Sequence, residues 1–247
     1  RRQDMFIFGS ECTITLIQTA TLTPLPYTIE TLREEPQETI LDPLIGYILP
    51  LTAIPNGTKI LGCIVTRVSD ETIEPLAILL FNGPRRLFDL LINRIAEKRI
   101  YQRLKLVGYQ LRANRDEPLY IRIDVEGTEA TDWNHTTPDI PWEQKETLEY
   151  KDGDIRIDGA ALPGIHRFSL TKTFRETETT YIQLHYALDT EHPLNNRLAI
   201  NTLTLTFGNR LRFTCTDLTC RTFDAKTDNA AEILIVRRYR IDGTILI

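Results

Sequence analysis

Alternation of apolar and polar residues with a period of two dominates this sequence. In residues 201–207, the apolar side chains of Leu203, Leu205 and Phe207 alternate with threonines at 202, 204 and 206. Successive side chains of a strand point to opposite faces, so the pattern predicts a strand with one buried face and one face toward solvent or a partner. Similar segments, rich in Thr, Ile, Val, Tyr and Phe, predict strands at 12–17, 60–68, 119–125, 167–171, 181–186, 198–207, 211–215 and 233–241. We expect a mainly β fold.

Two segments, one in each half of the chain, share a strand-turn-strand pattern. Residues 103–129 and 210–246 each begin with a basic alternating strand, cross a polar turn and end on a second alternating strand. Each closes with an acidic residue and a glycine, Glu126-Gly127 and Asp242-Gly243. The repetition predicts two similar β-sandwich or barrel-like units, and such a duplication supplies two similar lateral surfaces, as in proteins that form rings and tubes.

The predicted boundaries place the first domain at 1–130, a linker at 131–147 and the second domain at 148–247. The linker contains Trp133, Pro138, Pro141 and Trp142 among polar residues. One amphipathic α-helix is expected in the first domain near 84–98. Pro84 suits the first turn of a helix, and the apolar residues that follow it are spaced at i, i+3, i+4 and i+8, namely Leu87, Leu90, Leu91 and Ile95. Residues 31–41 contain Pro36, which favours a loop or a short turn there.

Composition and charge exclude several classes of protein. The chain has 247 residues, a formal net charge of −5 and a pI near 5.5, which argue against a protein that binds duplex nucleic acid. No run of about twenty apolar residues is present, so no helical membrane span is expected. The four cysteines, Cys12, Cys63, Cys215 and Cys220, are too few for a disulfide framework and fit a reducing compartment. The first residue is not Met, which leaves a removed leader peptide open.

No catalytic, cofactor-binding or metal-binding residue is predicted. Cys215 and Cys220 do not form a CxxC pair, so they are interpreted as core thiols. His185 falls in an alternating strand, and His166 and His192 fall in expected loops, without a nucleophile motif beside them.

Two charged patterns also have ordinary structural interpretations. The acidic pairs Asp152-Gly153-Asp154 and Asp158-Gly159 lack the spacing of a calcium loop and favour turns. The basic residues Arg237, Arg238 and Arg240 lie in one strand and are too few for a nucleic-acid patch. Pairing of these arginines with acids of a neighbouring subunit, such as Glu176 or Glu178, is a further possibility.

From about Leu148 onward the chain resembles the tail tube proteins of long-tailed bacteriophages. The resemblance is carried by DGDIRIDGAALPGIHRFSLTKTF (152–174) and EILIVRRYRIDGTILI (232–247), and in the first half PRRLFDLLINRIAEK (84–98) matches the family's flanking helix. It implies β-sandwich or barrel units flanked by one helix. It also implies homo-oligomeric rings, trimeric and pseudo-hexameric or hexameric, which stack into a hollow tube, contact other tail proteins and let genomic DNA pass without specific binding. Such a protein belongs to the virion tail, assembles in the host cytoplasm and has no enzymatic activity, cofactor or membrane partner.

Electrostatics and the pairing of sheet edges are both compatible with a conduit for DNA. A passage for DNA needs acidic or neutral walls, because a basic wall binds phosphates, and ring closure removes open sheet edges. Residues 30–39 and 175–180 are polar segments that are either arms ordered on ring stacking or surface loops.

The main alternative is a carbohydrate-binding or adhesin-type β-sandwich with Trp133, Trp142 and Tyr150 as a stacking platform. A hydrolase is the least favoured reading, since it needs a convergent His/acid pair that no spacing in the sequence suggests.

Overall fold

The computed structural model describes residues 13–18, 21–40, 53–94, 97–133, 146–175, 177–208, 210–227 and 233–247. The fold is mainly β with one α-helix, as predicted. The elements are β1 (Thr13–Gln18), β2 (Thr21–Leu25), β3 (Tyr27–Glu30), β4 (Arg33–Ile40), β5 (Ala53–Arg67), α1 (Ile73–Asn82), the 3₁₀ turn η1 (Gly83–Arg85), β6 (Phe88–Arg94), β7 (Glu97–Asn114), β8 (Tyr120–Gly127), β9 (Glu129–Asp132), β10 (Ile155–Ile157), β11 (Ala160–Ala161), β12 (Ile165–Thr173), β13 (Thr179–Ala187), β14 (Ala199–Phe207), β15 (Leu211–Thr227), β16 (Ile233–Ile241) and β17 (Ile245–Leu246).

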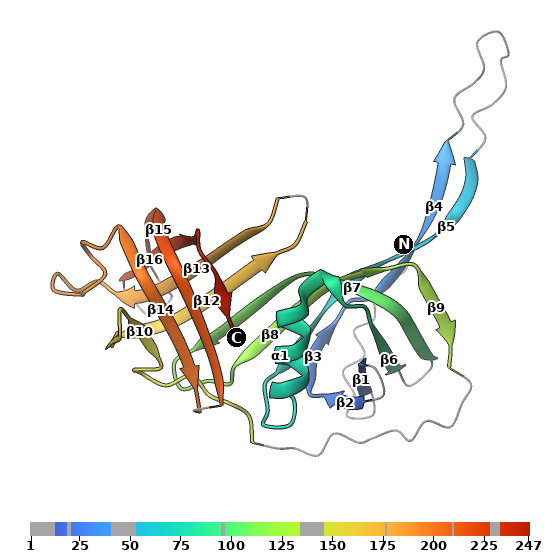
Figure 1. The fold of residues 1–247 in the computed structure, drawn as a ribbon, viewed down its shortest axis with the longest axis horizontal. Coiled ribbons are helices and arrows are strands. Elements are labelled where there is room, and N and C mark those ends of the chain that lie inside the picture. The colour runs from blue at the N-terminus through green and yellow to red at the C-terminus, as the bar shows by residue number, and fades with distance from the viewer. Residues whose placement is uncertain are drawn as a thin grey trace, which may run out of the picture.

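Antiparallel pairing connects these strands into two sheets that share β7. The larger sheet runs from β3 and β4 through β5, β8, β7, β12, β13, β16, β15 and β14 to β10 and β11, with β17 beside β15. The smaller sheet has the order β2-β1-β6-β7-β9. Figure 1 shows β7 and β8 crossing the middle of the molecule between its two lobes.

Strand β7 changes sheets at a bulge around Arg103. Its pairing with β6 shifts between Phe88↔Leu104 and Leu90↔Tyr101, so an extra residue of β7 is inserted there. Arg103 has a φ of 53°, and its N–H donates to the Asp89 carboxylate at 2.7 Å. The bend lets the first half of β7 complete the smaller sheet while its second half joins β8 and β12 in the larger one.

The second lobe, which contains β10 to β17, has in its core an aromatic stack between strands that are not neighbours in the sheet. The rings of Phe168 on β12 and Phe207 on β14 are stacked with centroids 5.6 Å apart, and Tyr150 meets Phe168 edge-on at 5.1 Å. All three side chains are fully buried, and burial of each contributes roughly 1.5–3 kcal/mol. The inner face of the alternating segment 201–207 therefore packs in this core, as predicted.

The α-helix lies at Ile73–Asn82, so the prediction of a helix near 84–98 is wrong. Gly83, with a φ of 56°, follows the last helical residue and donates its N–H to the Leu79 carbonyl, and Pro84 comes after it. The Gly-Pro pair therefore ends the α-helix, and only the short 3₁₀ turn η1 follows it. Residues Phe88–Arg94 form β6, whose leucines and isoleucine are buried on both faces of the strand, and this produced a false helical spacing.

The predicted loop at 31–41 is also wrong, because Arg33–Ile40 form strand β4. Strand β4 pairs with the first part of β5. Pro36 is compatible with this strand because β4 pairs on one side only in the described chain, and an edge strand tolerates a missing N–H. Together β4 and β5 form a two-stranded arm that projects from the body of the protein (Figure 1).

The two repeated segments both fold as antiparallel pairs, β7 with β8 and β15 with β16. Pairing of β7 with β12 continues the larger sheet across the predicted domain boundary, and β9 extends to Asp132 at the start of the predicted linker. Residues 134–145 of that linker lie outside the described residues. The internal duplication and its boundaries remain predictions.

Candidate functional site: a projecting arm, open sheet edges and a polar cleft

The arm formed by β4 and the first part of β5 is the most prominent feature outside the two lobes (Figure 1). Its register pairs Glu34 with Ile60 and Glu35 with Lys59, and a bulge follows Pro36. A two-stranded hairpin alone is marginally stable in water, so contacts at its base must set its direction.

Arg94 on β6 fixes the start of the arm through Glu30. Its Nε and Nη2 atoms donate to the Glu30 carboxylate at 3.0–3.1 Å, and Nη2 also lies 3.3 Å from the Leu32 carbonyl. The Glu30 side chain is only 11% exposed. Burial by itself lowers the pKa of Arg94, but the nearby Glu30 carboxylate outweighs it and the pKa is raised. Arg94 is therefore charged at any physiological pH.

Arg99 on β7 forms the second contact at the arm's base. Its guanidinium binds Glu34 of β4 and also Asp132 of β9, the latter at 2.5 Å. Hydrogen bonds to Glu34 and then to Asp132 raise the pKa of Arg99. The Arg99 guanidinium thus links β7, which both sheets share, to the arm and to the edge strand β9.

Gly62 on β5 lets the connection between β3 and β4 lie close to the β5 backbone. A Cβ atom at Gly62 would lie 2.6 Å from the Thr31 carbonyl oxygen and 2.7 Å from the Leu32 Cα. The Thr31 hydroxyl in turn accepts from the Cys63 N–H at 3.1 Å. The connection between β3 and β4 is packed directly on the β5 backbone.

The smaller sheet ends in two open edges within the part of the chain that the structure describes. Strand β2 pairs only with β1, and β9 pairs only with β7. The exposed edge residues include Leu22 on β2 and Glu129 and Asp132 on β9. An open edge presents unpaired backbone groups that can accept another strand.

The hairpin of β12 and β13 contains residues 175–180, the second polar segment predicted as an arm or a surface loop. Lys172 and Glu178 form an ion pair at 2.7 Å, and the Thr173 and Thr179 hydroxyls are 2.7 Å apart. Glu178 is therefore engaged within its own chain, and Glu176 lies outside the described residues.

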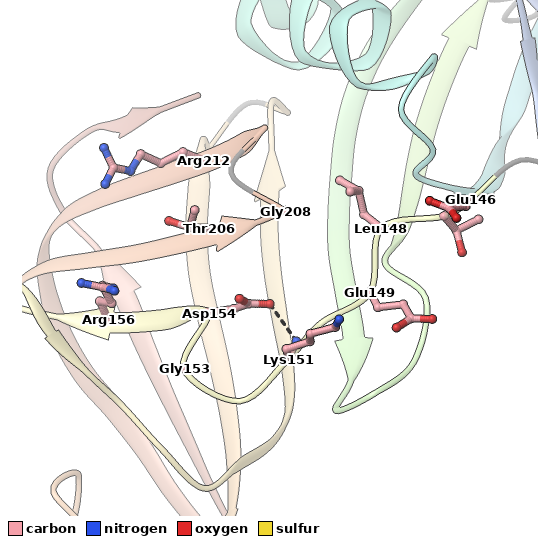
Figure 2. Close-up of a pocket in the computed structure, with 11 residues that line it drawn as sticks. Glu146, Leu148, Glu149, Lys151, Gly153, Asp154, Arg156, Thr206, Gly208 and Arg212 are labelled. Atoms are coloured by element: carbon pink, nitrogen blue, oxygen red, sulfur yellow. Dashed lines mark hydrogen bonds between the residues drawn. The ribbon is translucent and has the colours of Figure 1, made fainter.

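An open polar cleft of about 920 Å³ lies between the segment 146–151 and the outer face of β10, β14 and β15. Figure 2 shows Arg156, Thr206 and Arg212 on the sheet side and Glu146, Leu148 and Glu149 opposite. The register places Arg156 beside Thr204 and Arg212 beside Thr206, so the two arginines are diagonal neighbours across β14. The alternating pattern implied an outward threonine face, but it did not reveal these arginines as a pair.

Asp154 lines the cleft and also has a structural role. Its carboxylate accepts the Lys151 N–H at 2.7 Å, which closes a turn (Figure 2). Burial raises the pKa of Asp154. The described residues that line the cleft include no histidine or cysteine, and most of them are polar groups suited to binding.

The acidic turn residues bind protein groups. Asp152 accepts the Gly164 N–H at 3.0 Å, and Asp158 accepts the Thr202 N–H at 3.0 Å and pairs with Arg197 at 2.7 Å. Both Asp-Gly pairs lie in turns, as predicted. Across the described ranges, no group of three or more His, Cys, Asp and Glu residues could hold a metal ion.

The two cysteines of β15 differ in burial. Cys215 is fully buried, and burial raises the pKa of its thiol to about 12. Cys220 is partly exposed, with its sulfur 3.8 Å from the Thr222 carbonyl. The prediction of a core thiol is confirmed for Cys215 and only in part for Cys220. Cys63 is buried, and Cys12 lies outside the described residues.

His192 and Arg237 are the residues whose environment the sequence did not predict. Within the described chain, His166 and His185 are partly exposed, but His192 is only 8% exposed. Arg237 is 6% exposed and is buried together with Tyr239, two residues further along β16.

The described residues proposed for a carbohydrate platform differ in exposure. Tyr150 is fully buried, and its hydroxyl donates to the Ile165 carbonyl at 2.9 Å. Trp133 is partly exposed, and Trp142 lies outside the described residues. Tyr150 cannot stack on a ligand at the surface.

None of the helices described is long and apolar enough to cross a bilayer. Comparison of the sequence with models of known protein families and with curated proteins found no match.

Proposed function

We propose that this chain is a structural virion subunit that assembles into rings, which stack as a hollow tail tube for the passage of DNA. The observation that carries the proposal is the arm formed by β4 and β5, whose base is fixed by Arg94 and Arg99 although its strands extend away from the body (Figure 1). An arm that projects in a fixed direction adds little to the hydrophobic core of its own subunit. It is instead suited to contact a neighbouring subunit.

The open edges of the smaller sheet support the same proposal. Strands β2 and β9 form opposite ends of one sheet, so pairing of β2 in one subunit with β9 in the next would continue that sheet from subunit to subunit. Such head-to-tail contacts close into a ring when the rotation between subunits allows it. The net charge of −5 agrees with a passage that does not retain DNA.

The test is electron microscopy of the purified protein over a concentration series, with mass photometry on the same samples. We expect trimers or hexamers and regular rings or tubes. Leu22→Lys places a charge on edge strand β2 and should prevent ring formation. Leu198→Lys, at a 72% exposed leucine outside the strands, is the matched control and should assemble normally. A uniform monomer at every concentration and salt would contradict the proposal.

A binding module is the second candidate, and the open polar cleft is the observation that favours it. The guanidinium groups of Arg156 and Arg212 can bind an anionic or hydroxyl-rich ligand such as a sulfated or acidic glycan. A monomer that binds such glycans, and loses that binding in Arg156→Ala with Arg212→Ala, would replace the conduit as the preferred function.

A further inference from the structure

The segment 188–198, between β13 and β14, is fastened to the second lobe by a buried arginine. Arg237 on β16 donates to the Arg197 carbonyl at 3.2 Å and also binds the Asn195 carbonyl. Its Nε donates to the Tyr186 hydroxyl at 3.1 Å, and Tyr186 donates in turn to the Asn195 side chain at 3.1 Å. The segment is thus bound at its C-terminal end.

His192 fastens the middle of the same segment through both ring nitrogens. Its Nε2 lies 3.3 Å from the Pro163 carbonyl oxygen, and its Nδ1 lies 3.3 Å from the Leu194 backbone nitrogen. A carbonyl can only accept and an amide N–H can only donate, so Nε2 carries the hydrogen and Nδ1 is an acceptor. Both bonds exist together only in the neutral ring.

The surroundings of His192 oppose a second proton. The imidazole is stacked on the Tyr186 ring, with centroids 3.9 Å apart and an angle of 15°. The charged groups around it are Arg237 from β16 and Asp189 from its own segment, while the turn at Pro163 contributes backbone atoms. Asp189 and the Pro163 carbonyl favour the charged ring, but burial outweighs them with the help of Arg237, and the pKa of His192 is lowered.

We propose that His192 is a pH-sensitive latch, which holds the segment 188–198 on the second lobe when neutral and releases it when protonated. A proton on Nδ1 removes the acceptor for the Leu194 N–H and places two hydrogens against each other. The protonated ring also places a second positive charge close to the Arg237 guanidinium. The segment ends in two exposed leucines, Leu188 and Leu198, so its release changes an apolar part of the surface.

The direction of the pH effect follows from the lowered pKa. The folded state disfavours protonated His192, whereas the unfolded chain takes up the proton with a pKa near 6.5. The stabilisation by neutral His192 is therefore complete above about pH 6.5 and is lost as the pH falls toward the lower folded value.

The test is amide hydrogen exchange of the whole chain between pH 7.5 and 4.5, expressed as protection factors to remove the intrinsic pH dependence. The amides of Leu194 and Asn195, which bond within the segment, are the reporters. Their protection should fall at low pH, by roughly tenfold for each unit by which burial lowers the pKa of His192. In His192→Gln, which cannot gain a proton, protection should not depend on pH. In the control His166→Gln it should fall as in the unchanged protein.

Equal protection at both pH values in the unchanged protein would overturn the proposal, and so would a similar fall in His192→Gln. Should His192→Gln fail to fold, NMR titration of the histidine ring protons in the unchanged protein decides the question. The latch requires one histidine ring to titrate below the free value of about 6.5, and it requires the Leu194 amide signal to shift with the same midpoint. Titration of all ring signals near the free value would overturn it.

Discussion

Arg94 binds both carboxylate oxygens of Glu30, a residue 64 positions earlier in the chain, with contacts of 3.0–3.1 Å at the base of the β4–β5 arm. We expect Arg94→Met to lower the free energy of unfolding by about 1.5–3 kcal/mol, because it leaves the nearly buried Glu30 carboxylate without its partner. Urea denaturation at neutral pH measures the change.

Arg33→Met is the matched control for this prediction. Arg33 pairs with Glu35 on the same strand at 2.8 Å, but the Arg33 side chain is 71% exposed. Water and salt screen such a pair, so the expected change is below about 0.5 kcal/mol. Equal effects of the two substitutions would show that the base of the arm is not fixed by this ion pair.

Substitution of glycines tests the close packing of β5 against the start of the arm. In Gly62→Ala, the new Cβ meets only backbone atoms at 2.6–2.8 Å, so the connection between β3 and β4 has to move. We expect a loss of roughly 3 kcal/mol or more. In Gly108→Ala the nearest atom is the Lys172 carbonyl oxygen at 3.1 Å, and a loss near 1 kcal/mol is expected. Thermal unfolding of both variants gives the ranking, which a milder effect at Gly62 would contradict.

Sequence patterns predicted the strands with one buried face and failed where both faces are buried. The alternating segment at Leu203, Leu205 and Phe207 was recognisable because its threonines face outward. In β6, Leu90 and Ile92 face the same side as Ile14 and Leu16, while Leu91 is buried on the other side. A strand without a polar face has no period of two, and a helical spacing then appears by chance.

The candidate sites were less predictable because they depend on register and on distant contacts. Arg156 and Arg212 become neighbours only through the pairing of both β10 and β15 with β14. His192 is buried only because its ring lies on Tyr186. The sequence does not predict strand β4, because Pro36 favours a break, whereas an edge strand accepts a proline.

The thiols of β15 should differ in reactivity. Cys220 is partly exposed, whereas Cys215 is fully buried and burial raises its pKa to about 12. Only a thiolate reacts quickly with iodoacetamide. At pH 8 in native protein we therefore expect modification of Cys220 well before Cys215, and comparable rates in urea. Peptide mass spectrometry over a time course measures both, and fast native modification of Cys215 would mean that this core is open.

The arginine that fastens the segment 188–198 should not be replaceable by lysine. Arg237 reaches the Tyr186 hydroxyl and the carbonyls of Asn195 and Arg197 from one planar group, and its guanidinium also lies 5.0 Å from the centre of the Phe223 ring. A lysine ammonium is a compact charge and cannot reproduce that arrangement. We expect Arg237→Lys to cost about 2–4 kcal/mol of unfolding free energy, measured by urea denaturation.

Arg238, the neighbour of Arg237 on β16, is the control for this prediction. Arg238 points to the other face, where its guanidinium lies 4.6 Å from the centre of the partly exposed Tyr181 ring. A lysine retains much of that cation–π contact, so Arg238→Lys should cost less than about 1 kcal/mol. Because both substitutions remove the same chemical group from adjacent positions, the difference between them removes the intrinsic change of arginine to lysine. It reports the contacts that Arg237 makes with Tyr186, Asn195, Arg197 and Phe223. Similar losses for the two variants would mean that the carbonyls of Asn195 and Arg197 contribute little to holding the segment.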